Sequence, residues 1–409
     1  MGQEAVRDGG HRRDASVVAL VSAAHFVSHY YMLLLPPIFL AVQADYKVSF
    51  TELGLALGAF NLVTVIFQVP VGMLADAWSA RGVFLLGLLI GAASVLGAAL
   101  APTFLGLIGA FAVMGLANTA YHPAAYGILA YRIAPARLGY AFSVHTFAGF
   151  LGGACAPVTL IVLEHQLGWR GALMCAAGLG VVVALILLAG WSLLRDRDVG
   201  PKVVSHTGPT RIWSAEVVRN VFVFSCLAAA NSGVQGYTVV ALASAWGVPV
   251  LAGAAAISSY LFLLTVGVLV GGWVAERFPR HDLVMAVGLG VSGLALAGVG
   301  LLRLDATALL VVCGLGGFTN GLVLPSRDLI VKAATPPGAF GRVFAIVTTG
   351  FSIGNMFAPF VFGLLMDHDA PRGVFLAVAA FTLGAILLSV VGRPSRTPPG
   401  REAPVMALD

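Results

Sequence analysis

Long apolar runs, separated by short polar connections, fill almost the whole chain, and this pattern leaves few possible folds. Charged residues make up only 10% of the 409 residues, whereas about 25% is usual in a soluble domain. A helix that crosses a bilayer needs about 20 mainly apolar residues. The sequence therefore predicts an all-α integral membrane protein with twelve transmembrane helices.

The predicted spans form two sets of six. The first set is expected near residues 15–42, 52–75, 82–101, 103–131, 138–163 and 171–194, and the second near 214–243, 250–275, 283–302, 306–333, 340–366 and 373–391. A polar stretch with Gly and Pro separates the sets and is typical of a linker. We therefore expect an N-terminal half (1–194), a cytoplasmic linker (195–213) and a C-terminal half with a cytoplasmic tail (214–409).

The 23 Lys and Arg are distributed unevenly between the two sides that the loops would occupy. On one side the basic residues are only Lys47, Arg170, Arg303 and Arg372, and Arg327 lies within a span. Cytoplasmic loops carry the excess of Lys and Arg. Both termini are therefore expected in the cytoplasm, with the protein in the cytoplasmic (inner) membrane.

The second half repeats the first. At an offset of 202 positions Gly115 matches Gly317, and Asn118 matches Asn320. Further matches are Pro123 with Pro325, Gly152 with Gly354, Pro157 with Pro359 and Arg170 with Arg372. Repeats that are six spans apart share one orientation, so they are parallel repeats, and such repeats place a substrate site between the halves near the midplane.

A loop motif follows the second span. The stretch Gly72-Met-Leu-Ala-Asp76-Ala-Trp-Ser-Ala-Arg81 resembles the G-x-L-a-D-x-x-x-x-R signature of the major facilitator superfamily, with Gly272 and Glu276 as its weaker counterpart. The resemblance implies the major facilitator fold. It also implies that Gly72, Asp76, Arg81, Gly272 and Glu276 belong to gating loops.

Other family patterns are incomplete. The fifth span carries Ala148-Gly149 and Gly152-Gly153 where antiporters have G-P-x-x-G-G, and Phe111 stands where many members have Arg. The stretch Tyr121-His122-Pro123 is similar to fosmidomycin-resistance-type exporters, although Ala124 stands in place of their Glu.

Polar side chains within the spans are candidates for substrate binding, because such groups are costly in a bilayer and mark solute pathways. The candidates are His25, His29, Tyr30, Asn61, Asn118, His122, Tyr126, Asn231, Gln235, Asn320 and Arg327. Arg327 can receive an anion if its stripe faces the centre. Alternatively it snorkels to the interface or pairs with Asp328.

Proton coupling is expected from imidazoles, because no carboxylate lies deep in the first six spans and histidine titrates near neutral pH. The candidates are His29, His122, His145 and, in the second half, Asp328, which can instead pair with Lys332. A packing role for each histidine stays open. No metal is predicted, because no Cys or carboxylate accompanies these histidines at ligand spacing.

The resulting function is a secondary active transporter that works by alternating access. Two versions stay open: proton-coupled efflux of a drug-like or amphipathic compound, and proton-coupled uptake or exchange of a small organic anion. A non-transporting membrane receptor of the same fold is a remote alternative. The expected partners are a small-molecule substrate, protons and lipid, with no nucleic acid, no cofactor and no catalytic residue, in a monomer that is not an enzyme.

Overall fold

The computed structural model describes residues 2–194, 214–333, 335 and 340–390, and these residues form helices without a strand. The predicted linker and most of the predicted C-terminal tail lie outside the described residues. The first half contains α1 (Gly2–Met32), η1 (Pro36–Ile38), α2 (Phe39–Tyr46), α3 (Phe50–Ala77), α4 (Ala80–Leu100), α5 (Phe104–Asn118), α6 (Tyr121–Arg132) and α7 (Pro135–Ala189). The second half contains α8 (Ala215–Trp246), α9 (Val250–Arg277), α10 (His281–Leu301), α11 (Ala306–Ala333), α12 (Phe340–Asp367) and α13 (Pro371–Val390).

Eleven helical segments of the described chain are long and apolar enough to cross a membrane. The longest, α7, has 55 residues and is interrupted at Gly168, whose φ of 70° does not fit a helix. Glycine reaches such a φ at little cost because it has no Cβ. The segment therefore supplies two of the predicted spans, the fifth and the sixth, and the chain has twelve.

Side chains in the short connections cap the N-termini of several helices. The Ser49 hydroxyl accepts a hydrogen bond from the Glu52 backbone, and Glu52 accepts one from the Ser49 backbone, a capping box that starts α3. Ser79, Thr103 and Ser214 accept backbone hydrogen bonds at the starts of α4, α5 and α8. Such caps satisfy amide groups that have no partner within the helix.

Two spans are broken. The first changes from α1 through η1, which begins with Pro36 and Pro37, into α2. The fourth is interrupted at Thr119 and Ala120, between α5 and α6. Pro123 lacks an N–H, and its ring clashes with the carbonyl four residues earlier, which explains the break at this place.

Equivalent glycines bring equivalent helices together in the two halves. A Cβ on Gly115 would lie 2.3 Å from the Phe60 carbonyl oxygen, and a Cβ on Gly317 would lie 2.0 Å from the Tyr260 carbonyl oxygen. These contacts join α5 to α3 in the first half and α11 to α9 in the second. The repeat found in the sequence is therefore also a repeat of helix packing.

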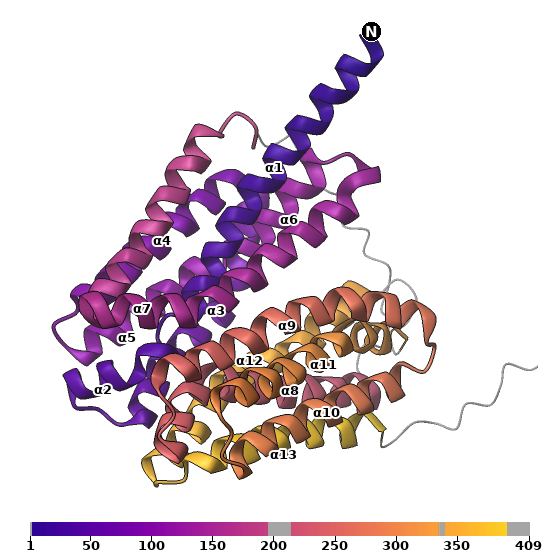
Figure 1. The fold of residues 1–409 in the computed structure, drawn as a ribbon. Helices are drawn as coiled ribbons and strands as arrows, with labels where there is room; N and C mark the ends of the chain where they lie inside the picture. Colours follow the sequence, from indigo (N-terminus) through magenta and orange to yellow (C-terminus); the bar gives the residue numbers. More distant parts are fainter. Residues whose placement is uncertain (1, 195–213, 334, 336–339, 391–409) are drawn as a thin grey trace, which may run out of the picture.

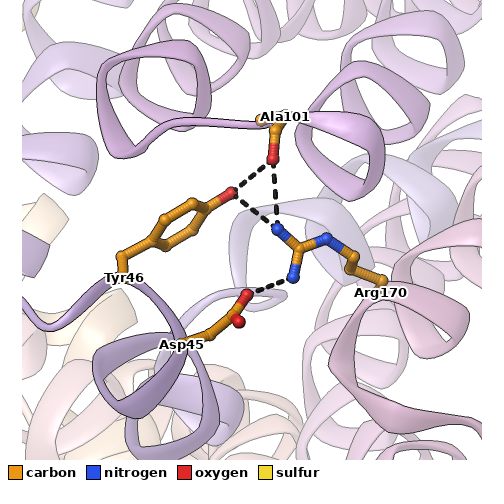
Figure 2. Close-up of polar contacts among 4 residues, drawn as sticks. All are labelled: Asp45, Tyr46, Ala101 and Arg170. Atoms are coloured by element: carbon orange, nitrogen blue, oxygen red, sulfur yellow. Dashed lines mark hydrogen bonds and ion pairs between the residues drawn. The ribbon is translucent and has the colours of Figure 1, made fainter.

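The end of the bundle that holds Asp45, Arg170 and Asp367 is called the distal end below, and the end that holds Asp76, Arg81 and Arg277 is called the terminal end. At the distal end Arg170 pairs with Asp45 and donates hydrogen bonds to the Tyr46 hydroxyl and the Ala101 carbonyl (Figure 2). In the second half Arg372 lies over the Trp246 ring, whose Nε1 donates to Val299. Each half thus carries an arginine–aromatic clamp.

The halves meet at the distal end (Figure 1). Asp367, the last residue of α12, accepts hydrogen bonds from the Phe50 and Thr51 amides, each 2.8 Å long, and from the Thr51 hydroxyl. A carboxylate of one half thus caps α3 of the other, where the helix dipole favours negative charge. We call this contact the distal latch.

Toward the terminal end, α3 is no longer packed against α12 of the other half. Contacts of α3 with α12 extend from Thr51 to Asn61, and all six residues from 65 to 70 are exposed. An α-helix has 3.6 residues per turn, so six consecutive exposed residues mean that every side of this part of α3 is at least partly exposed. The two halves accordingly diverge toward the terminal end (Figure 1).

Candidate functional site

A cavity of about 400 Å³ lies between the halves. Its lining comes from α1, η1, α3, α5 and α7 on one side and from α8, α9 and α12 on the other. The apolar part is rich in Phe and Met: Met32, Phe60, Phe111, Met114, Phe150 and Phe351. Ligand pockets are typically apolar with a few placed polar groups, and this cavity fits that description.

The polar part of the lining is uncharged. It consists of His29, Asn61, Asn231, Ser232, Gln235 and Asn355. Among the residues that the structure describes, no Asp, Glu, Lys or Arg lines the cavity. The cavity can therefore hold an uncharged or amphipathic solute through hydrogen bonds and apolar contact.

The amide side chains of Asn61 and Asn231 differ in their hydrogen bonding. Asn61 Nδ2 donates to its own helix at Leu57 O (2.8 Å) and across the halves to Asn355 O (3.3 Å). The Oδ1 atom of Asn231 is buried, and no described residue supplies it with a hydrogen-bond donor. A buried acceptor without a partner costs about 1–3 kcal/mol, a cost that a hydrogen bond from a solute would remove if the side chain turned this oxygen toward the cavity.

Four predicted binding residues line this cavity: His29, Asn61, Asn231 and Gln235. Tyr30 lies elsewhere, since its hydroxyl is hydrogen-bonded to Thr159 at 2.8 Å between α1 and α7. Asn320 donates to the Tyr260 hydroxyl at 2.7 Å and joins α11 to α9. Asn118 lines a separate small space beside Tyr31 and Tyr121.

Arg327 lies one side chain behind the cavity wall. Its guanidinium donates to the carboxylate of the next residue, Asp328, from Nε at 2.9 Å and from Nη2 at 2.8 Å. It also stacks on Phe224 and on the cavity-lining Phe351, with 4.6 and 5.2 Å to the ring centroids. Of the two pairings that the sequence left open for Asp328, the structure shows the one with Arg327.

The four predicted membrane histidines form one cluster beside the cavity. The ring centroid of His25 lies 4.6 Å from His29, 5.2 Å from His122 and 3.9 Å from His145. Tyr126 borders the cluster, with its ring 5.7 Å from that of His145. His25 and His145 are buried, His29 is half-buried and His122 is exposed.

Glycines of α7 make room for the cluster. A Cβ on Gly149 would lie 2.4 Å from the His25 ring, and a Cβ on Gly152 would lie 2.1 Å from the Phe26 carbonyl oxygen. These are two of the glycines in the incomplete antiporter pattern. In this chain they allow α1 to approach α7 closely enough to seat an imidazole between the helices.

The predicted gating residues lie at the terminal end. Asp76 and Glu276 are exposed, and Gly72 faces Pro123 of α6 at 3.7 Å, whereas nothing lies within 4 Å of a Cβ on Gly272. Arg81 donates to Trp191 O at 3.3 Å and stacks on the Trp191 ring. The first-half loop is thus attached to the end of the first bundle.

Sequence reasoning missed Ser232, Asn355 and the aromatic walls of the cavity. The repeat held a signal for one of them, because Asn355 is the counterpart of Gly153 at the same offset, and both line the cavity. Ser232 follows Asn231 directly and could have been examined with it. Nothing in the sequence distinguished the inward-facing phenylalanines from the many that face lipid.

Comparison with known proteins agrees with this architecture. The family model described as Major Facilitator Superfamily matches residues 21–240 and 221–407. The chain is similar to the uncharacterized MFS-type transporter YfnC of Bacillus subtilis (strain 168), with 23% identity over 385 residues and coverage of 91% of each chain. It is also similar to the fosmidomycin resistance protein of Escherichia coli (strain K12), with 22% identity and 92% coverage of each.

A solved structure has the same fold. It is the crystal structure of a bacterial homologue of the human lysosomal transporter Spinster, in an inward-facing and occupied conformation. The TM-score is 0.78 at 16% sequence identity, and the match covers 92% of this chain and 96% of that chain. The twelve-helix fold predicted from the sequence is confirmed, and the chain belongs to the Major Facilitator Superfamily of membrane transporters.

Proposed function

We propose that this transporter exports a drug-like or amphipathic compound in exchange for protons by alternating access. The observation that carries the proposal is the central cavity, which combines aromatic and Met walls with six uncharged polar side chains. A solute with one apolar surface and a few hydrogen-bonding groups is complementary to such walls. The similarity to a fosmidomycin resistance protein supports export as the direction.

The proposed orientation places the terminal end in the cytoplasm of a bacterial inner membrane. Arg132, Arg137, Arg219 and Lys332 lie at this end of their helices, and Lys and Arg are concentrated in cytoplasmic loops. The open side of the structure then faces the cytoplasm and the distal latch closes the outer side. In this state a compound enters the cavity from inside the cell.

The proposed path of protons runs through the histidine cluster. His29 lines the cavity and the His122 ring lies 6.1 Å from the His29 ring, so a proton on His29 and a solute can affect one another directly. No carboxylate accompanies the three histidines His25, His29 and His122 in their group within the described part of the chain. Imidazole is therefore the proton acceptor in this proposal.

The alternative of anion uptake has weaker support. Arg327, the candidate anion receptor, is bonded to Asp328 and lies behind Phe351. If an anion nevertheless binds there, Arg327→Ala abolishes its transport while the protein stays folded. Unchanged anion uptake by reconstituted Arg327→Ala vesicles would remove that alternative.

The test begins with growth of an export-deficient host on amphipathic antibiotics, fosmidomycin included, with and without the protein. Everted vesicles then measure accumulation of a protective compound under an imposed proton gradient across pH 5.5–8.5. We expect gradient-dependent accumulation whose pH dependence is lost in His29→Gln and in His122→Gln. His165→Gln, at an exposed position of α7, is the control.

Two results would contradict the proposal separately. Absence of both protection and gradient-driven accumulation would refute export. Accumulation with the wild-type pH profile in both histidine variants would leave export intact and remove the histidines from the coupling mechanism.

A further inference from the structure

Three histidines that are distant in the sequence meet beside the cavity. His25 and His29 are four residues apart on α1, which places them on one face of the helix, and His122 lies in the first turn of α6. One ring nitrogen from each lies within 4.8 Å of the others. The sequence did not predict a metal site, because the spacing of these residues along the chain does not show this convergence.

His25 has the hydrogen bonding of a metal ligand. Its Nδ1 lies 2.8 Å from the backbone carbonyl oxygen of His145. A carbonyl can only accept, so Nδ1 carries the hydrogen and Nε2 of the neutral ring has a lone pair. Histidines that bind metals commonly donate their other N–H to a backbone carbonyl, which fixes the tautomer and the ring orientation.

The lone pairs in the cluster lack partners. Nε2 of His25 and Nε2 of His29 are buried, and no described residue is hydrogen-bonded to either atom. Each buried polar atom without a partner costs about 1–3 kcal/mol. With the hydrogen of the neutral His29 ring on Nδ1, a cation at the centre of the cluster would satisfy the lone pairs of both Nε2 atoms at once.

The cluster is accessible from the cavity. His29 contributes to the cavity lining, and the exposed His122 has its ring centroid 6.1 Å from that of His29. An ion in the cavity can therefore reach His29, contact with the buried Nε2 of His25 requires movement of the rings, and three histidine ligands leave a further coordination position open. That position can be filled by water or by an oxygen of a solute.

We propose that His25, His29 and His122 bind a divalent transition-metal ion of the Zn²⁺ type. Imidazole suits Zn²⁺, Cu²⁺ and Ni²⁺, and three protein ligands with one open position form a common Zn²⁺ arrangement. At Zn–N distances of about 2.1 Å the ligand nitrogens lie about 3.4 Å apart. Small side-chain rotations close the difference from the observed spacing.

The site goes beyond the proposed transport activity and does not depend on it. Metal and protons require the same lone pairs, so binding should weaken at acidic pH. Occupancy would also remove the imidazoles from proton exchange. Metal binding is measured without a transported compound, so the two proposals can fail independently.

The experiment uses the purified full-length protein with an affinity tag that contains no histidine. After treatment with EDTA, Co²⁺ is titrated at pH 7.5 and followed by its visible d–d absorption, and Zn²⁺ is then added as competitor. We expect about one Co²⁺ per chain, bands typical of a four-coordinate ion, displacement by Zn²⁺, and at least tenfold weaker binding at pH 5.5.

The variants separate this site from adventitious binding. His29→Gln and His122→Gln should each weaken Co²⁺ binding at least tenfold, while His165→Gln retains wild-type affinity. His122 is exposed, so His122→Gln preserves the packing and keeps the test informative if a change at buried His25 prevents folding. Absence of saturable binding, or wild-type affinity in both His29→Gln and His122→Gln, would overturn the proposal.

Discussion

At the scale of single residues, the contact of Gly149 with His25 shows how a small side chain positions a functional one. The His25 ring occupies the space that a Cβ on Gly149 would need, and this places its Nδ1 at the His145 carbonyl. Small residues allow close packing of membrane helices. Here the close approach also sets the orientation of an imidazole.

We expect Gly149→Ala to destabilise the protein by about 1–3 kcal/mol, the usual cost of overpacking, because the added methyl group would lie 2.4 Å from the His25 ring. Thermal unfolding in detergent measures the change. Gly178→Ala is the control, since it lies in the part of α7 that follows Gly168 and no described atom lies within 4 Å of its Cβ position. Equal unfolding temperatures for the two variants would contradict this packing.

The sequence predicted some of the site's residues and not others, for physical reasons. Polarity within an apolar span identified His29, Asn61, Asn231 and Gln235, which line the cavity. The same criterion also selected Asn320, whose amide serves helix packing. In a bilayer the outer face of a helix is as apolar as its packed face, so hydrophobic periodicity does not show which way a side chain points.

At the scale of helices, the arginine–aromatic clamps close equivalent corners of the two bundles. Arg170 stacks on Trp169 at 4.1 Å, and Arg372 stacks on Trp246 at 4.0 Å. The match of Arg170 with Arg372 was visible in the repeat, whereas the aromatic partners were not. Trp169 precedes its arginine directly, while Trp246 ends a different helix, so no common spacing relates them.

Arg170→Ala should lower the stability of the protein by about 1–2 kcal/mol, because it removes a cation–π contact and hydrogen bonds made by a charged group. Arg303→Ala, at an exposed position of another distal loop, should change stability by less than about 0.5 kcal/mol. Chemical denaturation followed by tryptophan fluorescence measures both. Equal stabilities would show that the stacking on Trp169 and the polar contacts of Arg170 drawn in Figure 2 contribute little.

In the distal latch, Asp367 of the second half is bonded to the N-terminus of α3 in the first half. Asp367→Asn keeps a side-chain oxygen but removes the charge that faces the α3 amides, so we expect the distal end to open more often. Pulsed EPR between spin labels at positions 77 and 277, in a chain whose four native cysteines are replaced, measures the separation at the terminal end. Asp367→Asn should shift the distribution to shorter distances.

The control for the latch is Asp369→Asn. It removes a negative charge from the same loop, and asparagine tolerates the φ of 56° at this residue. A shift of equal size in this variant would attribute the effect to loop charge and not to the cap on α3.

At the scale of the whole molecule, the two halves share one fold but differ in where their histidines and charged residues lie. Glycine contacts recur in both halves, but the histidine cluster lies entirely in the first half and the Arg327–Asp328 pair in the second. The repeat predicted the fold well because helix packing depends on small residues at fixed positions. It could not predict the cluster, which depends on α1, α6 and α7 meeting in space.

Fixing the distal latch should stop alternating access. Thr51 and Asp367 are in side-chain contact, so this pair is chosen for cysteines that an oxidant would join by a disulfide across the halves. In a chain without native cysteines, Ser232→Cys then reports access to the cavity through a membrane-impermeant maleimide. Oxidation should reduce labelling from the distal side at least tenfold and leave labelling from the terminal side unchanged.

Chains with only one of the two latch cysteines are the control and should be labelled alike with and without oxidant. Reduction of the disulfide should restore distal labelling. Undiminished distal labelling of the oxidised chain would show that solute reaches the cavity without separation of Thr51 from Asp367.

The uncharged lining of the cavity has an electrical consequence. Among the described residues no fixed charge faces the solute space, so reorientation of the empty carrier moves little charge through the membrane field. Each elementary charge that crosses 100 mV carries about 2.3 kcal/mol. The voltage dependence of turnover should therefore report the charge of the cargo and the exchanged protons, which makes electrophysiology a direct measure of their stoichiometry.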